Sequence, residues 1–179
     1  MTIILSGLVA GIVLGVIVYR GILYAVPIRL MLLAERRMLK LRNNATNTFF
    51  HGRGPRPNAR QIVMPSPDLI YSSCIYDLSR GALRMSGALP PAGHYWSLSL
   101  YAHNTDNYFV LNDRELPQRQ FDITVHPPMS RATGDGAGIV KSPSMKGIAL
   151  VRMIQRRPDD LPLIQAAQQS IRCENAAPA

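Results

Sequence analysis

The sequence predicts a mainly β protein, with an antiparallel β-sandwich or jelly-roll-like domain between an N-terminal transmembrane helix and a C-terminal capping helix. Three patterns predict this fold class. An unbroken apolar run covers residues 3–19, short strand-like runs separated by turn signals extend from residue 61 to 155, and an apolar helical pattern that begins with acids comes last. The chain of 179 residues thus divides into a transmembrane helix with a basic amphipathic segment (1–42), a linker or extended arm (43–60) and the β-sandwich domain with its helix (61–179).

The apolar run is almost long enough to cross a membrane by itself. Its seventeen residues give about 25 Å of helix against a hydrocarbon core of about 30 Å, and continuation to Val26 supplies the difference. A cleaved signal peptide and a buried core helix are the alternatives. Signal peptides usually begin with basic residues and end at small residues, whereas Met1 and Thr2 are uncharged and Tyr-Arg-Gly-Ile follows the run. We therefore expect a retained single-pass anchor.

Small residues recur on one face of this helix. Gly7, Gly11 and Gly15 are four residues apart, and Ala10 is close to them. Positions four apart share a helix face, so these residues leave a groove into which another helix backbone can pack. We expect the partner to be a transmembrane helix of another membrane protein or of a second copy of this chain.

Positive charge is concentrated beside the apolar run. The first 60 residues contain nine basic residues and one acid, whereas the rest contain eleven basic residues and ten acids. Anionic lipid headgroups attract such a segment, and we expect them to contact Arg20, Arg29, Arg36, Arg37, Lys40 and Arg42. We do not expect nucleic acid as a partner, because no zinc-finger spacing or aromatic RNA-binding signature accompanies the basic residues.

Residues 28–42 have an amphipathic helical pattern, with Met31, Ala34, Met38 and Leu41 at helical spacing. If Pro27 bends the chain, this segment forms a second helix that lies along the membrane surface. The alternative is one long helix that leaves the bilayer, because membrane helices tolerate proline. The pattern leaves both open.

Residues 43–60 are rich in Asn, Thr, Gly and Pro, which indicates a linker. After it we expect strands at 61–64, 69–78, 82–85, 94–101, 108–111, 121–125, 139–141 and 147–155. Residues 94–101 alternate clearly, with Tyr95, Ser97, Ser99 and Tyr101 on one side and Trp96, Leu98 and Leu100 on the other. Asp159, Asp160 and Pro162 then open a final helix that we expect to cap an open end of the sandwich.

Catalytic motifs do not stand out. There is no HExxH, GxSxG or Walker A motif, so we expect no catalytic residue and no cofactor. His94, His103 and Asp106 are weak candidates for a metal site at one edge of the sheet, but no closing ligand motif accompanies them. Asp77 and Asp113 are the acids most expected to approach each other, and a structural role is favoured for both.

Four blocks of sequence carry a family resemblance: PDLIYSSCIYDLS at 67–79, YWSLSLY at 95–101, NYFVLNDR at 107–114 and GIALVR at 147–152. In this order they resemble bacterial proteins that carry the domain of unknown function 1254. The chain is similar to the short, membrane-anchored version found in proteobacteria, often associated with a companion of the domain of unknown function 1214 family. The resemblance covers residues 64–173. It implies a β-rich, usually exported domain, with no established catalytic residues.

Two arguments about the side of the membrane oppose each other. Basic residues after the span favour a cytoplasmic domain. A disulfide between Cys74 and Cys173 would instead require the oxidising periplasm, although two buried free thiols remain the alternative. We favour the periplasm slightly, because the family resemblance implies export.

These patterns together predict a single-pass protein of the bacterial inner membrane that acts as a non-catalytic accessory or assembly subunit of a larger membrane complex. The alternative is an envelope protein that binds or hydrolyses a ligand at a site between the sheets.

Overall fold

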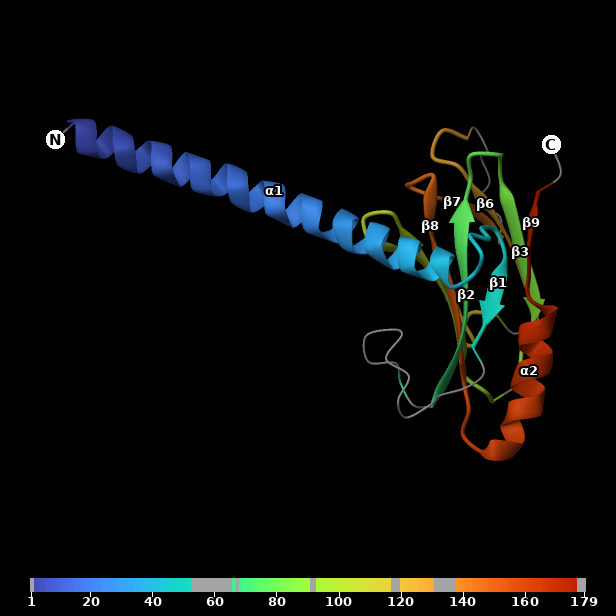
Figure 1. Cartoon of the computed structure of the whole chain (residues 1–179). Coiled ribbons are helices and arrows are strands. Elements are labelled where there is room, and N and C mark those ends of the chain that lie inside the picture. Colours follow the sequence, from blue (N-terminus) through green and yellow to red (C-terminus); the bar gives the residue numbers. More distant parts are fainter. Residues whose placement is uncertain are drawn as a thin grey trace.

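A computed structural model describes residues 2–52, 66, 68–90, 93–116, 120–130 and 138–176. A long helix, α1 (Thr2–Lys40), projects from a β domain built of two facing sheets (Figure 1). The five-stranded sheet has the order β1-β2-β8-β4-β5, and the four-stranded sheet has the order β7-β6-β3-β9. The strands are β1 (Phe49–His51), β2 (Leu69–Asp77), β3 (Leu83–Ala88), β4 (Trp96–Ala102), β5 (Asn107–Asn112), β6 (Gln120–His126), β7 (Ile139–Lys141), β8 (Lys146–Ile154) and β9 (Arg172–Asn175). The predicted mainly β fold, with a helix at each end, is therefore confirmed.

Rows of paired residues fix which side chains share a face of the five-stranded sheet. One row joins Tyr71, Arg152, Ser97 and Asn112, and the next joins Ser73, Leu150, Ser99 and Val110. Residues paired across strands point to the same side, so both rows lie on one face. We call this the outer face, because the alternate positions of β4, which are Trp96, Leu98 and Leu100, point into the core between the sheets.

The core holds the two sheets together. The rings of Trp96 in β4 and Phe121 in β6 stack across it with centroids 6.3 Å apart. Gly147 lies where the Tyr76 ring crosses the sheet, and a Cβ at this position would collide with Tyr76 and with the carbonyl oxygen of Tyr101. Because Gly147 has no side chain, the Tyr76 hydroxyl reaches the carbonyl oxygen of Tyr101 and donates to it at 3.1 Å.

The C-terminal helix α2 (Leu161–Ser170) follows a short 3₁₀ turn, η1 (Pro158–Asp160), at the predicted acidic start. It contacts β3 of one sheet, and its buried Gln168 donates to Ser72 Oγ of β2 in the other sheet at 2.9 Å. The helix therefore closes one edge of the sandwich. Strand β9 was not predicted, because its four residues have no alternating apolar pattern.

The structure corrects the expected organisation of residues 28–60. Helix α1 continues through Pro27 to Lys40, so the single long helix is right and the separate surface helix is wrong. Its last turns pack on the β domain, where Met31 is only 5% exposed. Strand β1 lies within the predicted linker and pairs with β2. Residues 53–60 and the strand predicted at 61–64 lie outside the described residues.

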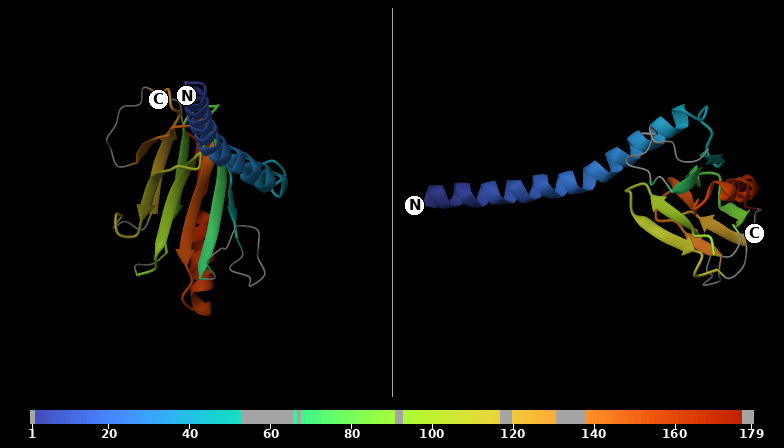
Figure 2. Two further views of the ribbon diagram at one scale, coloured as in Figure 1. Left: turned by 90° about the vertical axis from the view of Figure 1, so that its left-hand side faces the viewer. Right: turned by 90° about the horizontal axis from the view of Figure 1, so that it is seen from below.

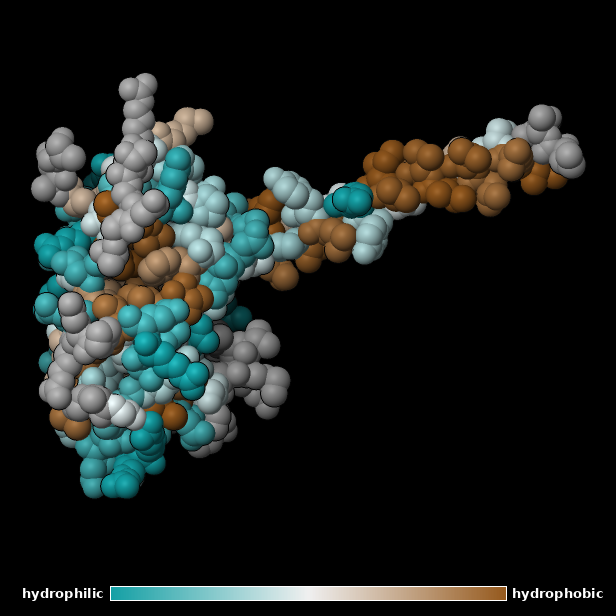
Figure 3. Space-filling view, turned by 180° about the vertical axis from the view of Figure 1, so that it is seen from behind, coloured by the Kyte–Doolittle hydropathy of each residue, from teal (hydrophilic) through white to brown (hydrophobic). Residues whose placement is uncertain are grey.

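Among the described residues, the N-terminal part of α1 projects away from the β domain and makes no contact with it (Figures 2 and 3). Within the residues that the structure describes, Ile4–Lys40 contains the one stretch that is long and apolar enough to cross a membrane. By length and composition alone, an N-terminal secretion signal meets the same criterion.

Candidate functional site

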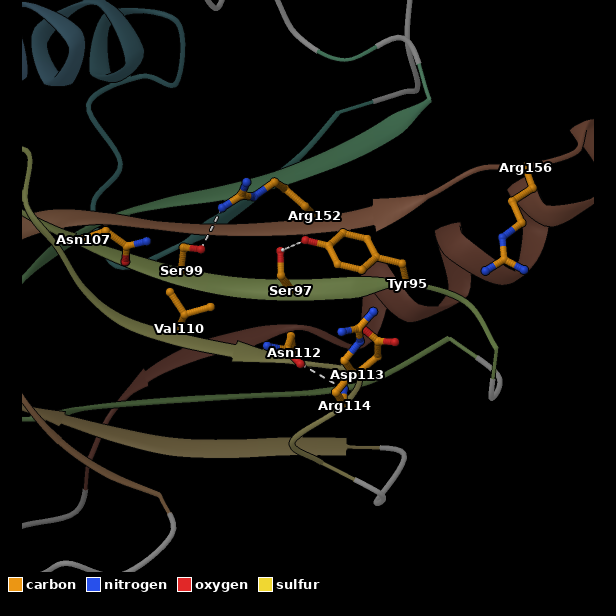
Figure 4. A pocket seen from close by; sticks show the side chains of 10 residues that line it. All are labelled: Tyr95, Ser97, Ser99, Asn107, Val110, Asn112, Asp113, Arg114, Arg152 and Arg156. Atoms are coloured by element: carbon orange, nitrogen blue, oxygen red, sulfur yellow. Dashed lines mark hydrogen bonds between the residues drawn. The ribbon is translucent and has the colours of Figure 1, made fainter.

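A polar groove lies on the outer face of the five-stranded sheet (Figure 4). It has a volume of about 620 Å³ and is lined by Tyr95, Ser97, Ser99, Asn107, Val110, Asn112, Asp113, Arg114, Arg152 and Arg156. Strands β4, β5 and β8 supply its floor, because the paired rows of these strands place their alternate side chains on this face. We call it the arginine groove, since its lining contains three guanidinium groups and one carboxylate, that of Asp113.

The floor of the arginine groove is ordered by hydrogen bonds. Arg152 Nη2 donates to Ser99 Oγ at 2.8 Å and lies 3.4 Å from the Tyr101 hydroxyl. Arg152 Nε is buried and has no hydrogen-bond partner among the described residues. Tyr95 donates its hydroxyl to Ser97 Oγ at 3.1 Å. The fold thus fixes a guanidinium in the floor and leaves part of its donor capacity unused.

The end of α1 is attached to the same outer face. The Arg42 guanidinium lies 4.5 Å from the centroid of the Phe50 ring, and its Nη2 donates to Ser73 Oγ at 2.6 Å. A second link follows at Asn47, whose side chain accepts from the Asp77 N–H at 2.7 Å. Since Ser73 shares a row with Ser99, α1 and the arginine groove lie on the same side of the β domain.

A buried carboxylate lies at this joint. Glu35 is only 6% exposed, and its Oε1 is 3.7 Å from Nδ1 of His103, which follows β4. Neither atom has a hydrogen-bond partner among the described residues. A buried carboxylate that loses its partner is costly, because its charge is then uncompensated. Separation of Glu35 from His103 is therefore unfavourable, and the pair holds the helix to one end of β4.

A second polar cluster lies nearby. The Tyr76 hydroxyl is 3.0 Å from the Tyr108 hydroxyl and 3.3 Å from Ser142 Oγ. Burial raises the pKa of Tyr76 and that of Tyr108, so both phenols stay protonated at neutral pH. The hydrogen bonds of this cluster hold strand ends together inside the domain.

The residues predicted to contact lipid divide into two groups. Arg20, Arg29, Arg36, Arg37 and Lys40 are exposed on α1, as headgroup contact requires. Arg42 is instead half-buried against Phe50 and Ser73, so its role in the fold is structural. For the predicted packing face, a Cβ added at Gly7, Gly11 or Gly15 would meet nothing within 4 Å among the described residues, and Ala10 is exposed beside them.

The weak metal candidates are not brought together. His94 precedes β4 and lies 3.3 Å from Asp160, whereas His103 follows β4 and faces Glu35. Asp106 accepts instead from the Asn104 side chain at 2.5 Å. In the described part of the chain, no three His, Cys, Asp or Glu side chains gather in a group that could hold a metal ion.

Two further expectations about sites also change. Asp77 pairs with Lys146 at one end of β2, at 3.2 Å, whereas Asp113 lines the groove near the start of β4, so these acids do not meet. Among the described residues, core side chains fill the space between the sheets, and the groove lies on the outer face instead. The alternation at residues 94–101 predicted that Ser97 and Ser99 share a face of the strand. Only strand pairing shows that Arg152 and Asn112 lie beside them.

The two cysteines do meet. Cys74 of β2 and Cys173 of β9 are free thiols from opposite sheets. Interaction with the neighbouring Cys173 thiol, together with burial, raises the pKa of the Cys74 thiol well above its ordinary value, so it stays protonated. The contact supplies the proximity that the predicted disulfide needs.

Comparison with known proteins identifies a family. The sequence matches the family model described as "Protein of unknown function (DUF1254)" over residues 46–175. Comparison with curated proteins finds no match. The VPA0106 protein from Vibrio parahaemolyticus has a similar structure, with a TM-score of 0.69 and 11% identity over 88% of this chain and 39% of that one.

An uncharacterised protein from Burkholderia cenocepacia has a TM-score of 0.50 and 18% identity, over 90% of this chain and 44% of that one. The chain therefore spans about two fifths of the length of both structures. At these identities the likeness extends to the fold alone.

The attachment of α1 can be tested at Arg42. Replacement by alanine, Arg42→Ala, removes the contact with the Phe50 ring and the bonds to Ser73, and we expect it to lower the free energy of unfolding by about 1–3 kcal/mol. Arg36→Ala is the matched control, because this exposed arginine lies close by in sequence, near the end of α1. Urea unfolding of the full chain, followed by fluorescence of the single tryptophan, measures the difference. Equal effects of the two substitutions would contradict the assigned role of Arg42.

Acid should weaken the turn before α2. Backbone N–H donation from Arg157, together with His94 and the Arg156 N–H, lowers the pKa of Asp160. Because the folded-state pKa lies below the unfolded value of about 3.9, the carboxylate stabilises the fold above that pH, and this is lost as pH falls through the folded-state pKa. We therefore expect Asp160→Asn to lower the Tm at pH 7 and to match the unsubstituted protein in strong acid. Asp159→Asn is the control, and a Tm difference that persists in strong acid would refute the mechanism.

Proposed function

Since the chain belongs to the DUF1254 family of proteins of unknown function, we propose its role from its geometry: a single-pass protein of the bacterial inner membrane that acts as a non-catalytic accessory or assembly subunit of a larger membrane complex. In this role α1 anchors the chain, and the β domain is held at a fixed orientation outside the bilayer. The proposal is independent of any reaction, because it rests on how the helix and the domain are joined.

One observation carries the proposal: α1 is continuous from a fully uncovered apolar part to a part that is packed on the β domain. Side chains from Ile4 to Val26 remain exposed, whereas Met31 and Glu35 are buried. Each large apolar side chain that leaves water is stabilised by about 1.5–3 kcal/mol, so lipid and a partner helix are the favourable surroundings for the uncovered part. A secretion signal does not need to be built into the contacts of the mature fold, and this favours a retained anchor.

The glycine face supports a helical partner in the membrane. Gly7, Gly11 and Gly15 leave one side of α1 without side chains, and the structure shows open space at each of them among the described residues. Close approach of helix backbones is a main source of association within lipid, where the hydrophobic effect does not act between helices. A second helix packed there would hold the chain in a complex.

The thiol contact supports a periplasmic β domain. Cys74 and Cys173 lie together across the sandwich, so a disulfide oxidant of the periplasm can accept two electrons and two protons from them and leave a bond between the sheets. The opposing argument is the basic stretch after the span, which favours the cytoplasm. The pairing of two cysteines so far apart in sequence decides our preference.

Replacement of the three glycines tests the partner. We expect the triple substitution Gly7→Leu, Gly11→Leu, Gly15→Leu to reduce recovery of co-purifying membrane proteins about tenfold, while the chain stays in the membrane fraction. The matched control is Val9→Leu, Val13→Leu, Ile17→Leu, which changes the opposite face of α1. The measurement is mass spectrometry after gentle detergent extraction. Crosslinking of Ala10→Cys separates pairing with a second copy from pairing with another protein. Unchanged recovery with the triple glycine variant would count against the proposal.

The thiols test the orientation. Cells are quenched in acid, denatured and labelled with a maleimide that increases the mass, with and without prior reduction. With the β domain in the periplasm, we expect Cys74 and Cys173 to be labelled only after reduction, and Cys74→Ser to make Cys173 reactive without it. Labelling of both thiols without reductant would place the domain in the cytoplasm.

A further inference from the structure

The arginine groove lies on the outer face of β4, β5 and β8. We propose that it binds a small soluble molecule with a polar body and a phosphate or similar oxyanion. This inference goes beyond the proposed role in a membrane complex, because it holds whether or not α1 has a partner.

The charges of the groove favour an anion. Arg114, Arg152 and Arg156 line it, and Asp113 is the one acid among the lining residues. Guanidinium groups present planar forks of N–H donors that match the oxygens of phosphate and carboxylate. The three arginines come from different segments, after β5, within β8 and after β8, so strand pairing is what gathers them.

The floor is organised before any ligand arrives. Ser99 is fully buried, and its hydroxyl accepts from Arg152 Nη2 at 2.8 Å. The same guanidinium keeps Nε buried without an acceptor among the described residues. The bond to Ser99 holds the Arg152 guanidinium in place, so an oxyanion that accepts from its Nη atoms makes a charge-assisted hydrogen bond with little loss of side-chain freedom.

The remaining lining fits a polar body. Ser97, Asn107 and Asn112 offer hydroxyl and amide groups that both donate and accept, and the Tyr95 ring lies beside Ser97 (Figure 4). The volume of about 620 Å³ is within the range of small-molecule sites. Val110 is the single aliphatic residue in the lining, and every other lining side chain carries a hydroxyl, amide, carboxylate or guanidinium group.

A free ligand is favoured over the headgroup of a bilayer lipid. If about 20 residues from Ile4 cross the hydrocarbon core, the remaining part of α1 to Lys40 adds about 25 Å of helix. The outer face, to which α1 is attached, is then held well beyond the lipid phosphates. A molecule in solution enters the groove from that space, whereas a phospholipid would have to leave the bilayer.

The experiment uses the full chain in lipid nanodiscs and inorganic phosphate as the probe. Phosphate is titrated calorimetrically at constant ionic strength, with chloride as the replaced anion, in discs of neutral phosphatidylcholine. We expect saturable binding by the unsubstituted chain. The double substitution Arg114→Gln, Arg156→Gln should raise the Kd about tenfold or more. Arg152→Lys, which keeps the charge but removes the planar guanidinium, should also raise it. Arg80→Gln, which removes an exposed arginine outside the groove, should leave the Kd unchanged.

Three outcomes would overturn the proposal. Absence of saturable binding by the folded chain refutes the anion site. An equal loss with Arg80→Gln shows diffuse attraction to net charge. Loss of phosphate binding in discs that contain phosphatidylglycerol, with full binding in neutral discs, assigns the groove to a lipid. If Arg152→Lys fails to fold, the double variant decides alone. Partner recovery with the glycine variants is measured separately, so failure of the groove proposal is distinguishable from failure of the proposed function.

Discussion

The attachment of α1 to the outer face of the five-stranded sheet determines how every other surface of this protein is presented. Arg42 on Phe50 and Ser73, with Glu35 against His103, converts the end of a long apolar helix into part of the β domain. A flexible linker would leave the domain free to rotate above the membrane. The joint instead fixes which face is directed along the helix, and that face holds the arginine groove.

The sandwich supports this joint by closing its own edges with contacts between distant parts of the chain. Helix α2 connects the sheets through Gln168 and Ser72, and the thiols of Cys74 and Cys173 meet across the core. Both contacts involve β2, the strand that also receives Arg42. Strand β2 is therefore held by Arg42 after α1, by Cys173 across the core and by Gln168 of α2, which makes it a rigid base for the anchor.

Sequence patterns predicted the elements in which burial of one face dictates the order of apolar and polar residues. The alternation at residues 94–101 placed β4 within about two residues, and the acids before Pro162 marked the start of α2. Strand β1 lies in an Asn- and Thr-rich segment without alternation, and only pairing with β2 stabilises it. The role of Arg42 and the gathering of Arg114, Arg152 and Arg156 depend on strand register, which no local pattern encodes. The same holds for His94 and His103, whose spacing suggested one site although the intervening strand separates them.

The apolar surface of α1 extends farther than a bilayer requires. If about 20 residues from Ile4 cross a bilayer, the part of the helix beyond the hydrocarbon core includes Leu30 and Leu33, which are 58% and 61% exposed. Arg29 and Arg36 flank the shallow surface around Leu33, so its rim is basic while its centre is apolar. Lipid headgroups match the arginines and not the leucines, whereas a protein surface with an apolar centre and acidic rim matches both. In the proposed role, a partner helix is therefore expected to continue along α1 toward the β domain, which would join recognition in the bilayer to recognition outside it.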